Sequence, residues 1–163
     1  MKNMIRREKR PLKNMGSRLK NKRVKPKALG FGDIAVGDVY SFSRVISQKD
    51  VKSFARLTGD YNPLHLDKRY AKNTQFKCSV IHGMLGASLF STLIGMYCPG
   101  KYALLLDQEI SYIRPIKPNS CLKVVGEVKN KIDALKVIVL KLSILGEDES
   151  LLTEGMSKIK IMR

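Results

Sequence analysis

Apolar and polar residues alternate along several segments of this chain, whereas one segment is apolar on nearly every side. The alternation over Val39–Val45 is typical of a half-buried strand. Residues 83–96 are almost all apolar or small, which predicts a helix that is buried on every side. After residue 101 the pattern is that of strands alone, and a tight Asp133-Ala134 turn joins the middle pair of the four segments 102–113, 122–132, 135–145 and 151–162.

Two shorter helices are expected before the long one. Ser47 is a typical N-cap, with Asp50 three residues later, for a helix that ends at Gly59. Asp67 can cap a second helix over residues 68–72. Because the helices come first and an antiparallel sheet follows, the fold class is α+β, with a sheet of about five strands wrapped around the long buried helix.

The positive charge is concentrated at the N-terminus. Residues 1–27 hold 12 Lys or Arg and only Glu8 as an acidic residue, and so carry +11 of the formal net charge of +17. This composition predicts that residues 1–29 form a basic extension that is disordered alone, followed by one domain at 30–163. The extension could bind nucleic acid, target the protein to an organelle, bind an acidic partner or an anionic membrane surface, or simply be solvated.

The remaining composition argues against several classes of protein. The three cysteines, Cys78, Cys98 and Cys121, are odd in number and widely spaced, which fits neither a disulfide framework nor a metal site and favours a reducing compartment, the cytoplasm or alternatively the mitochondrial matrix. Two histidines without ligand spacing do not predict a zinc site. Residues 30–32 (Gly-Phe-Gly) fit no dinucleotide fingerprint, and no run of about 18 apolar residues predicts a membrane span.

The candidate chemistry begins in residues 57–67, where Asp60 and His65 are five positions apart and Asn62-Pro63 lies between them. Gly59 permits an unusual backbone angle and Pro63 restricts the residue before it, so that a loop can turn both side chains inward. A carboxylate and an imidazole placed in this way suit general acid and base catalysis. The alternative is an ordinary turn in which Asp and Asn hydrogen-bond to their own backbone.

A second candidate is the start of the long helix at His82-Gly83. Unpaired N–H groups and the helix dipole at this end can stabilise developing negative charge, whereas the alternative is a plain core helix. We assign His82 a structural role in shaping the start of the helix and Asp67 a role as a cap. Cys78 is expected to be a packing residue.

The two stretches together resemble the MaoC-like (R)-specific enoyl-CoA hydratases and the related 3-hydroxyacyl-thioester dehydratases. The resemblance rests on Leu57-Thr-Gly-Asp-Tyr-Asn-Pro-Leu-His-Leu-Asp67, on Tyr70-Ala71, and on Val80-Ile-His-Gly-Met-Leu85 with Ala87-Ser-Leu-Phe-Ser91. It continues through Pro99-Gly100 and residues 108–112, and covers the chain from about Val36 onward. The basic extension lies outside it.

The resemblance implies a hot-dog fold, a homodimer, and reversible addition of water to a trans-2-enoyl thioester to give an (R)-3-hydroxyacyl thioester, without metal or cofactor. In that scheme Asp60 and His65 hold the water, and one takes its proton while the other handles the proton at the α-carbon. The N–H of Gly83 polarises the thioester carbonyl. Asn62 supports the loop, and Ser91 lies near the acyl pocket. Members of the group often carry a larger aliphatic residue in place of Gly86, so that this position leaves either a deeper pocket or a more closely packed helix.

Two other functions remain open at this stage. The domain could be a non-catalytic hot-dog subunit of a larger, possibly RNA-containing assembly that is anchored by the basic extension. It could also be a thioesterase on the same fold. The residues after 27 carry the remaining +6 of the formal net charge. For the hydratase, this positive charge suits an anionic acyl carrier, which is either coenzyme A or an acidic acyl carrier protein.

Overall fold

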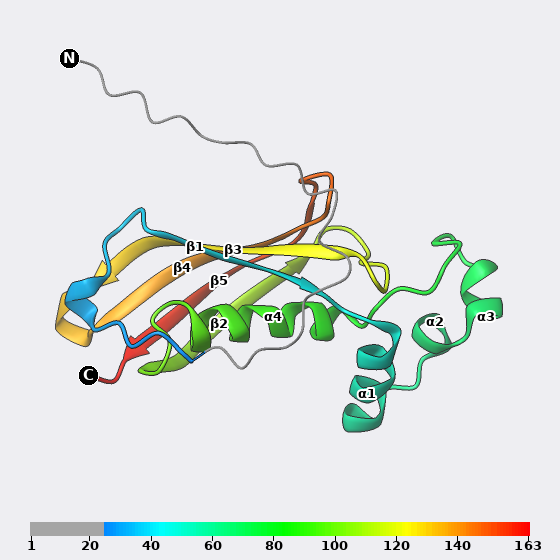
Figure 1. The fold of residues 1–163 in the computed structure, drawn as a ribbon, viewed down its shortest axis with the longest axis horizontal. Helices are drawn as coiled ribbons and strands as arrows, with labels where there is room; N and C mark the ends of the chain where they lie inside the picture. Colours follow the sequence, from blue (N-terminus) through cyan, green and yellow to red (C-terminus); the bar gives the residue numbers. More distant parts are fainter. Residues whose placement is uncertain (1–24) are drawn as a thin grey trace, which may run out of the picture.

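The computed structural model of the chain describes residues 25–163, and its centre is one antiparallel sheet that curves over a long helix (Figure 1). The five strands lie in the order β1-β3-β4-β5-β2. The predicted α+β class and hot-dog arrangement are therefore confirmed. The strands are β1 (Val39–Val45), β2 (Ala103–Tyr112), β3 (Cys121–Ile132), β4 (Val137–Leu145) and β5 (Leu151–Ile161).

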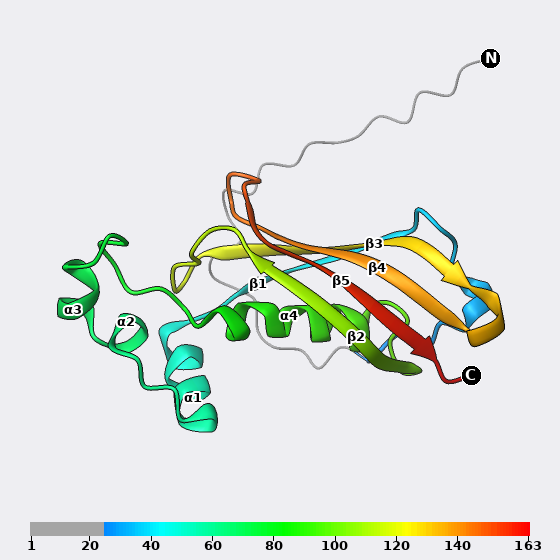
Figure 2. The same cartoon turned by 180° about the vertical axis from the view of Figure 1, so that it is seen from behind.

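The long helix α4 (Gly83–Met96) lies against the inner face of the sheet, and three short helices project beyond one end (Figure 2). These are α1 (Gln48–Thr58), α2 (Pro63–Leu66) and α3 (Lys68–Lys72). Both predicted caps are confirmed. Ser47 and Asp50 form a reciprocal capping box at the start of α1, and the Asp67 carboxylate accepts hydrogen bonds from the first N–H groups of α3.

The core is formed between α4 and the inward-facing residues of the sheet. Phe90 and Leu93 of α4 are fully buried, as are alternate residues of the central strands such as Leu140 and Leu142 of β4. Two strand positions opposite the helix carry glycine. At Gly126 a Cβ would lie 2.6 Å from Cδ2 of Leu93, and at Gly155 it would meet the Glu109 carbonyl. The missing side chain at Gly126 therefore lets the helix approach the sheet closely, whereas the one at Gly155 makes room for the backbone of β2.

The expectation that α4 is buried on every side is wrong for the single protomer. Met84 is 60% exposed, and Ser88, Ser91 and Thr92 are exposed along the same side of the helix. The sheet covers only one side of α4, and the spacing of these residues places them in one stripe on the opposite side. We call these four residues the uncovered stripe of α4.

The turn between β3 and β4 also differs from the prediction. Instead of a tight Asp133-Ala134 turn, the chain makes a 3-10 turn over Asp133–Leu135, and Lys136 adopts a left-handed conformation with φ 52°. A two-residue hairpin requires left-handed residues at its centre, which Asp-Ala does not favour. The positive φ therefore falls on Lys136, and β4 begins at residue 137 rather than 135.

Residues 25–29 belong to the predicted basic extension but are included in the described part of the chain. The Lys27 N–H donates to the Met96 carbonyl at 3.0 Å, and the Leu29 N–H donates to the Pro99 carbonyl at 3.1 Å. This segment therefore lies along the C-terminal end of α4. The rest of the extension, residues 1–24, and the nucleic-acid or anionic partner predicted for it lie outside the described residues.

Cys98 provides a first prediction. It is fully buried, and burial raises the pKa of its thiol to about 12, although a hydrogen bond with Tyr40 acts in the opposite direction. Because the thiolate is the reactive form, we expect a thiol reagent at mildly alkaline pH to label the partly exposed Cys78 and Cys121 and to spare Cys98 until the protein is denatured. Mass spectrometry of the labelled peptides measures this. Labelling of Cys98 in the native protein at the rate of Cys78 would contradict it.

No helix within residues 25–163 combines the length and the apolar composition that a membrane span requires.

Candidate active site

The loop after α1 places Asp60 through a series of local hydrogen bonds. Gly59 ends α1 with φ 78°, and its N–H donates to the Ala55 carbonyl at 2.8 Å. Oδ1 of Asp60 accepts from the Asn62 N–H at 3.1 Å, while the Asn62 side chain accepts from the Leu64 N–H and caps α2. The turn interpretation is therefore correct for one carboxylate oxygen. The other, Oδ2, lies 3.9 Å from Nε2 of His82, and the side chain is 52% exposed.

His65 lies on α2, where its ring is held in one tautomer. Its Nδ1 is 2.8 Å from the backbone carbonyl of Val80. Because a carbonyl oxygen can only accept, Nδ1 must carry a hydrogen, and in the neutral ring the lone pair is then on Nε2. His65 can therefore accept a proton at Nε2 without losing the hydrogen bond that orients it.

His82 has a larger part in the site than its predicted structural role suggests. The side chain is almost completely buried, and its Nε2 donates to the backbone carbonyl of Asp60 at 3.0 Å. Its ring lies 3.9 Å from the ring of His65 and 5.0 Å from that of Phe54, measured between centroids. His82 therefore contacts both the loop that carries Asp60 and the imidazole of His65. In the sequence, the one feature of His82 that indicated a place in the site was its position directly before Gly83.

One oxygen or nitrogen atom from each of Asp60, His65 and His82 lies within 4.8 Å of the others. Two histidines and a carboxylate are residue types that bind metals. However, Nε2 of His82, the nitrogen that faces Asp60, must carry a hydrogen to donate to the Asp60 carbonyl, and the lone pair of the neutral ring is then on the buried, unpartnered Nδ1. The arrangement suits the transfer of protons between a carboxylate and an imidazole better than it suits a metal.

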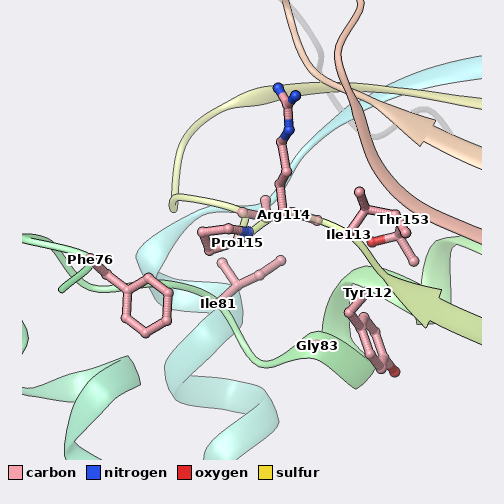
Figure 3. A pocket seen from close by; sticks show the side chains of 9 residues that line it. Phe76, Ile81, Gly83, Tyr112, Ile113, Arg114, Pro115 and Thr153 are labelled. Carbon is pink, nitrogen blue, oxygen red and sulfur yellow. The ribbon is translucent and has the colours of Figure 1, made fainter. Parts of the chain in front are cut away.

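A pocket of about 260 Å³ lies beside the first turn of α4 (Figure 3). Gly83 lies in its wall, next to the ring of Tyr112, and the Arg114 side chain extends away from it. Since the first N–H groups of an α-helix have no partner within the helix, this wall offers donors and the positive end of a dipole. The remaining lining is largely apolar: Phe76, Ile81, Ile113, Pro115, Ile116 and Thr153.

The structure brings some of the predicted site residues together and separates others. Asp60 and His65 lie close together beside His82, which directly precedes Gly83. Neither Asp60 nor His65 lines the pocket. Gly86 lies behind the pocket wall, because a Cβ there would meet Ile116 at 3.1 Å and Ile81 at 3.5 Å. Of the two alternatives for Gly86, the structure therefore favours close packing. Ser91 belongs to the uncovered stripe of α4 and does not line the pocket.

Comparison with known proteins gives a consistent picture. Residues 33–145 match the model of the MaoC like domain. The (R)-specific enoyl-CoA hydratase of Aeromonas caviae is 42% identical over 83 residues, which are 51% of this chain and 62% of that protein. The 3-hydroxybutyryl-CoA dehydratase of Methylorubrum extorquens is 31% identical over 83% of this chain and 85% of its own length. Among solved structures, the (R)-hydratase of A. caviae superposes with a TM-score of 0.76 at 33% identity, over 78% of this chain and 97% of that one.

Proposed function

Because this chain belongs to the family of MaoC-like domains, we propose that it is a hydro-lyase that adds water reversibly to a trans-2-enoyl thioester and forms an (R)-3-hydroxyacyl thioester. The observation that carries the proposal is the cluster of Asp60, His65 and His82 directly before the N-terminus of α4. It combines a proton acceptor, a carboxylate and an electrophilic helix end, which are the groups that hydration of a conjugated thioester requires.

His65 is the base in this proposal. Its Nε2 accepts a proton from the attacking water, while the oxygen of that water bonds to the β-carbon of the substrate. The hydrogen bond from Nδ1 to the Val80 carbonyl persists and stabilises the imidazolium that forms. The same proton then passes to the α-carbon, which leaves His65 neutral and balances the reaction.

Asp60 orients the water and stabilises the imidazolium in this proposal. One carboxylate oxygen is occupied by the Asn62 N–H, which fixes the side chain, and Oδ2 remains to accept a hydrogen bond from the water. The negative charge of Asp60 offsets the positive charge that develops on the imidazole during the reaction. Asn62 therefore acts on the loop rather than on the substrate.

Gly83 supplies the electrophilic half of the site. Attack at the β-carbon gives the thioester oxygen enolate character, and in this proposal the N–H of Gly83, the first residue of the 14-residue helix α4, stabilises that charge. A donor of this kind typically contributes about 2.7–4 kcal/mol to lowering the barrier. The pocket beside Gly83 is the place for the thioester and the adjoining part of its chain. Ile81 and Ile116, which pack against Gly86, form one of its walls.

A second copy of the chain is the partner that best explains the uncovered surfaces, and we propose a homodimer. Strand β2 is at the edge of the sheet and exposes Leu104, Leu105 and Leu106, which are 46%, 42% and 52% accessible. Its far end, at Tyr112, adjoins Gly83 and Met84. An exposed apolar edge strand is a liability that pairing with another strand removes. Pairing there would also cover the stripe of α4 that contains Ser91.

The dimer can be tested at the two edges of the sheet. Leu106→Lys on β2 is expected to convert the dimer to a monomer in light scattering, because it places a charge in the proposed interface. Val39→Lys is the matched control, since Val39 is 62% exposed on the opposite edge strand, β1. A wild-type protein that is monomeric, or two variants that behave alike, would contradict the proposed interface.

His82 is expected to act as a positioning residue. His82→Phe keeps an aromatic ring beside His65 but removes the donor to the Asp60 carbonyl, and we expect kcat to fall by about tenfold to a hundredfold because the carboxylate is displaced. His82→Gln can restore an N–H near the position of Nε2 and should recover part of the loss. Equal kcat values for the two variants would show that the hydrogen bond has no role beyond packing.

The activity is tested by following the thioester absorbance of crotonyl-CoA while the purified protein hydrates it. Turnover with formation of the (R)-3-hydroxy product supports the proposal, and no turnover overturns it. Release of free thiol instead would identify a thioesterase. The non-catalytic, RNA-associated alternative is not favoured by the relatives, which carry the names of hydratases and dehydratases.

The cellular setting is part of the same proposal. Cys78, Cys98 and Cys121 are all free thiols, which favours a reducing compartment, either the cytoplasm or the mitochondrial matrix. The substrate there is an acyl thioester of coenzyme A or of an acyl carrier protein.

A further inference from the structure

The three short helices and the turn after them carry an unusual number of unpaired positive charges. Residues 48–77, which we call the cationic lobe, contain seven Lys or Arg and three Asp. All seven cations are exposed, and none forms an ion pair with a carboxylate in the described part of the chain. They are Lys49, Lys52, Arg56, Lys68, Arg69, Lys72 and Lys77.

The cations are arranged in rows rather than scattered. On α1, Lys49, Lys52 and Arg56 are spaced by three and four residues and so share one face of the helix, away from the buried Val51 and Ala55. On α3, Lys68 and Lys72 are four residues apart and also share a face. The lobe therefore presents one cationic row on α1 and another on α3, with α2 between the two helices (Figure 1).

None of the three carboxylates of the lobe forms an ion pair with the cations of these rows. Asp50 is bound to the N-cap Ser47, with Oδ2 at 2.8 Å from its N–H and 2.7 Å from its Oγ. Asp67 accepts two backbone N–H groups of α3. Asp60 belongs to the active site. The carboxylates keep their negative charge in these hydrogen bonds, so the lobe carries a net formal charge of +4 from seven cations and three carboxylates.

We propose that the cationic lobe docks a small acidic acyl carrier protein that presents the enoyl thioester to this active site, an inference that rests on the function proposed above. Charge complementarity favours this partner, since a negatively charged protein surface is large enough to reach cations on both α1 and α3. The phosphates of coenzyme A form a compact group and could contact only some of seven cations distributed over α1, α3 and the turn at Lys77.

Two further features fit a protein partner rather than a nucleotide. The lobe exposes large apolar side chains among its charges: Leu57 is 84%, Tyr61 60% and Tyr70 50% accessible. Apolar side chains within a charged rim are typical of protein interfaces. The lobe also lies next to the substrate pocket, because Phe76, at its end, is one of the lining residues (Figure 3). A thioester on a flexible arm could enter there from a carrier bound to the lobe.

The double variant Lys52→Glu/Lys68→Glu tests the surface without weakening the helices. Glu at position 52 is four residues before Arg56, a favourable pair on α1, and Glu at position 68 lies in the first turn of α3, where negative charge is stabilising. For crotonyl-loaded acyl carrier protein we expect kcat/KM to fall by about tenfold or more, mainly through KM and with strong salt dependence in the wild type. For crotonyl-CoA we expect a change of less than about twofold, because the lobe's cations are not needed for the smaller carrier.

Lys141→Glu on the outer face of β4 provides the matched charge reversal away from the lobe. It should leave kcat/KM for both substrates unchanged. Equal losses for both substrates in the double variant, no loss for the carrier protein, or a similar loss in Lys141→Glu would each overturn the docking surface while the proposed function stands. No hydration of crotonyl-CoA by the wild type would instead overturn the proposed function.

Discussion

His65→Asn is expected to lower kcat for crotonyl-CoA hydration by about 10²- to 10⁴-fold, the range lost when a positioned base is removed. The substitution is selective, because the side-chain amide N–H of Asn can take the place of Nδ1 and still donate to the Val80 carbonyl. Nothing replaces the lone pair of Nε2. Hydration under saturating substrate measures the loss directly, and KM should change little.

His65→Ala is the comparison that separates catalysis from support of the loop. It should lose a similar amount of kcat and also lower the melting temperature, since the Val80 carbonyl then loses its partner. Retention of wild-type kcat by His65→Asn would exclude His65 as the base. An equally large drop in melting temperature in both variants would mean that Asn does not restore the hydrogen bond.

Gly83→Pro is expected to reduce kcat by about 10²- to 10³-fold, because it deletes the single N–H that we assign to the thioester oxygen. The fold should accept the substitution. Gly83 is the first residue of α4, where proline is favoured, and His82 has φ −60° and ψ 135°, a conformation suited to a residue before proline.

Gly83→Ala provides the steric control for that experiment. A Cβ at Gly83 meets the Tyr112 ring at 3.0 Å, so both variants require this exposed side chain to move. Only proline lacks the N–H. If alanine and proline reduce kcat equally, the loss comes from Tyr112 and the pocket, and the N–H has no special role.

Local chemistry explains why much of the fold could be predicted from the sequence. The capping box of Ser47 and Asp50, the left-handed Gly59 and the cap at Asp67 each depend on residues within a few positions, and all three are confirmed. The apolar run of α4 and the alternation of the strands are likewise visible in the chain. The 3-10 turn before Lys136 was missed because its backbone angles are set by the register of two long strands as well as by local preference.

The features that the sequence did not predict depend on contacts between distant segments. The hydrogen bond from His82 to the Asp60 carbonyl joins residues 22 positions apart, and nothing in the pattern around His82 indicates it. The uncovered stripe of α4 was missed for a different reason. Small and apolar residues fill both the side that faces the sheet and the side that faces outward, so periodicity could not distinguish the buried side from the exposed one.

Gly126 of β3 affects the position of α4, the helix that begins at the proposed donor Gly83. Because Leu93 occupies the space where a Cβ would be, α4 lies closer to β3 at Gly126 than any other residue there would allow. The N–H of Gly83, our proposed donor to the thioester oxygen, belongs to the same helix, ten residues before Leu93. We therefore expect a side chain at position 126 to shift α4 and, with it, the N–H that we propose for the thioester oxygen, although residue 126 does not line the pocket.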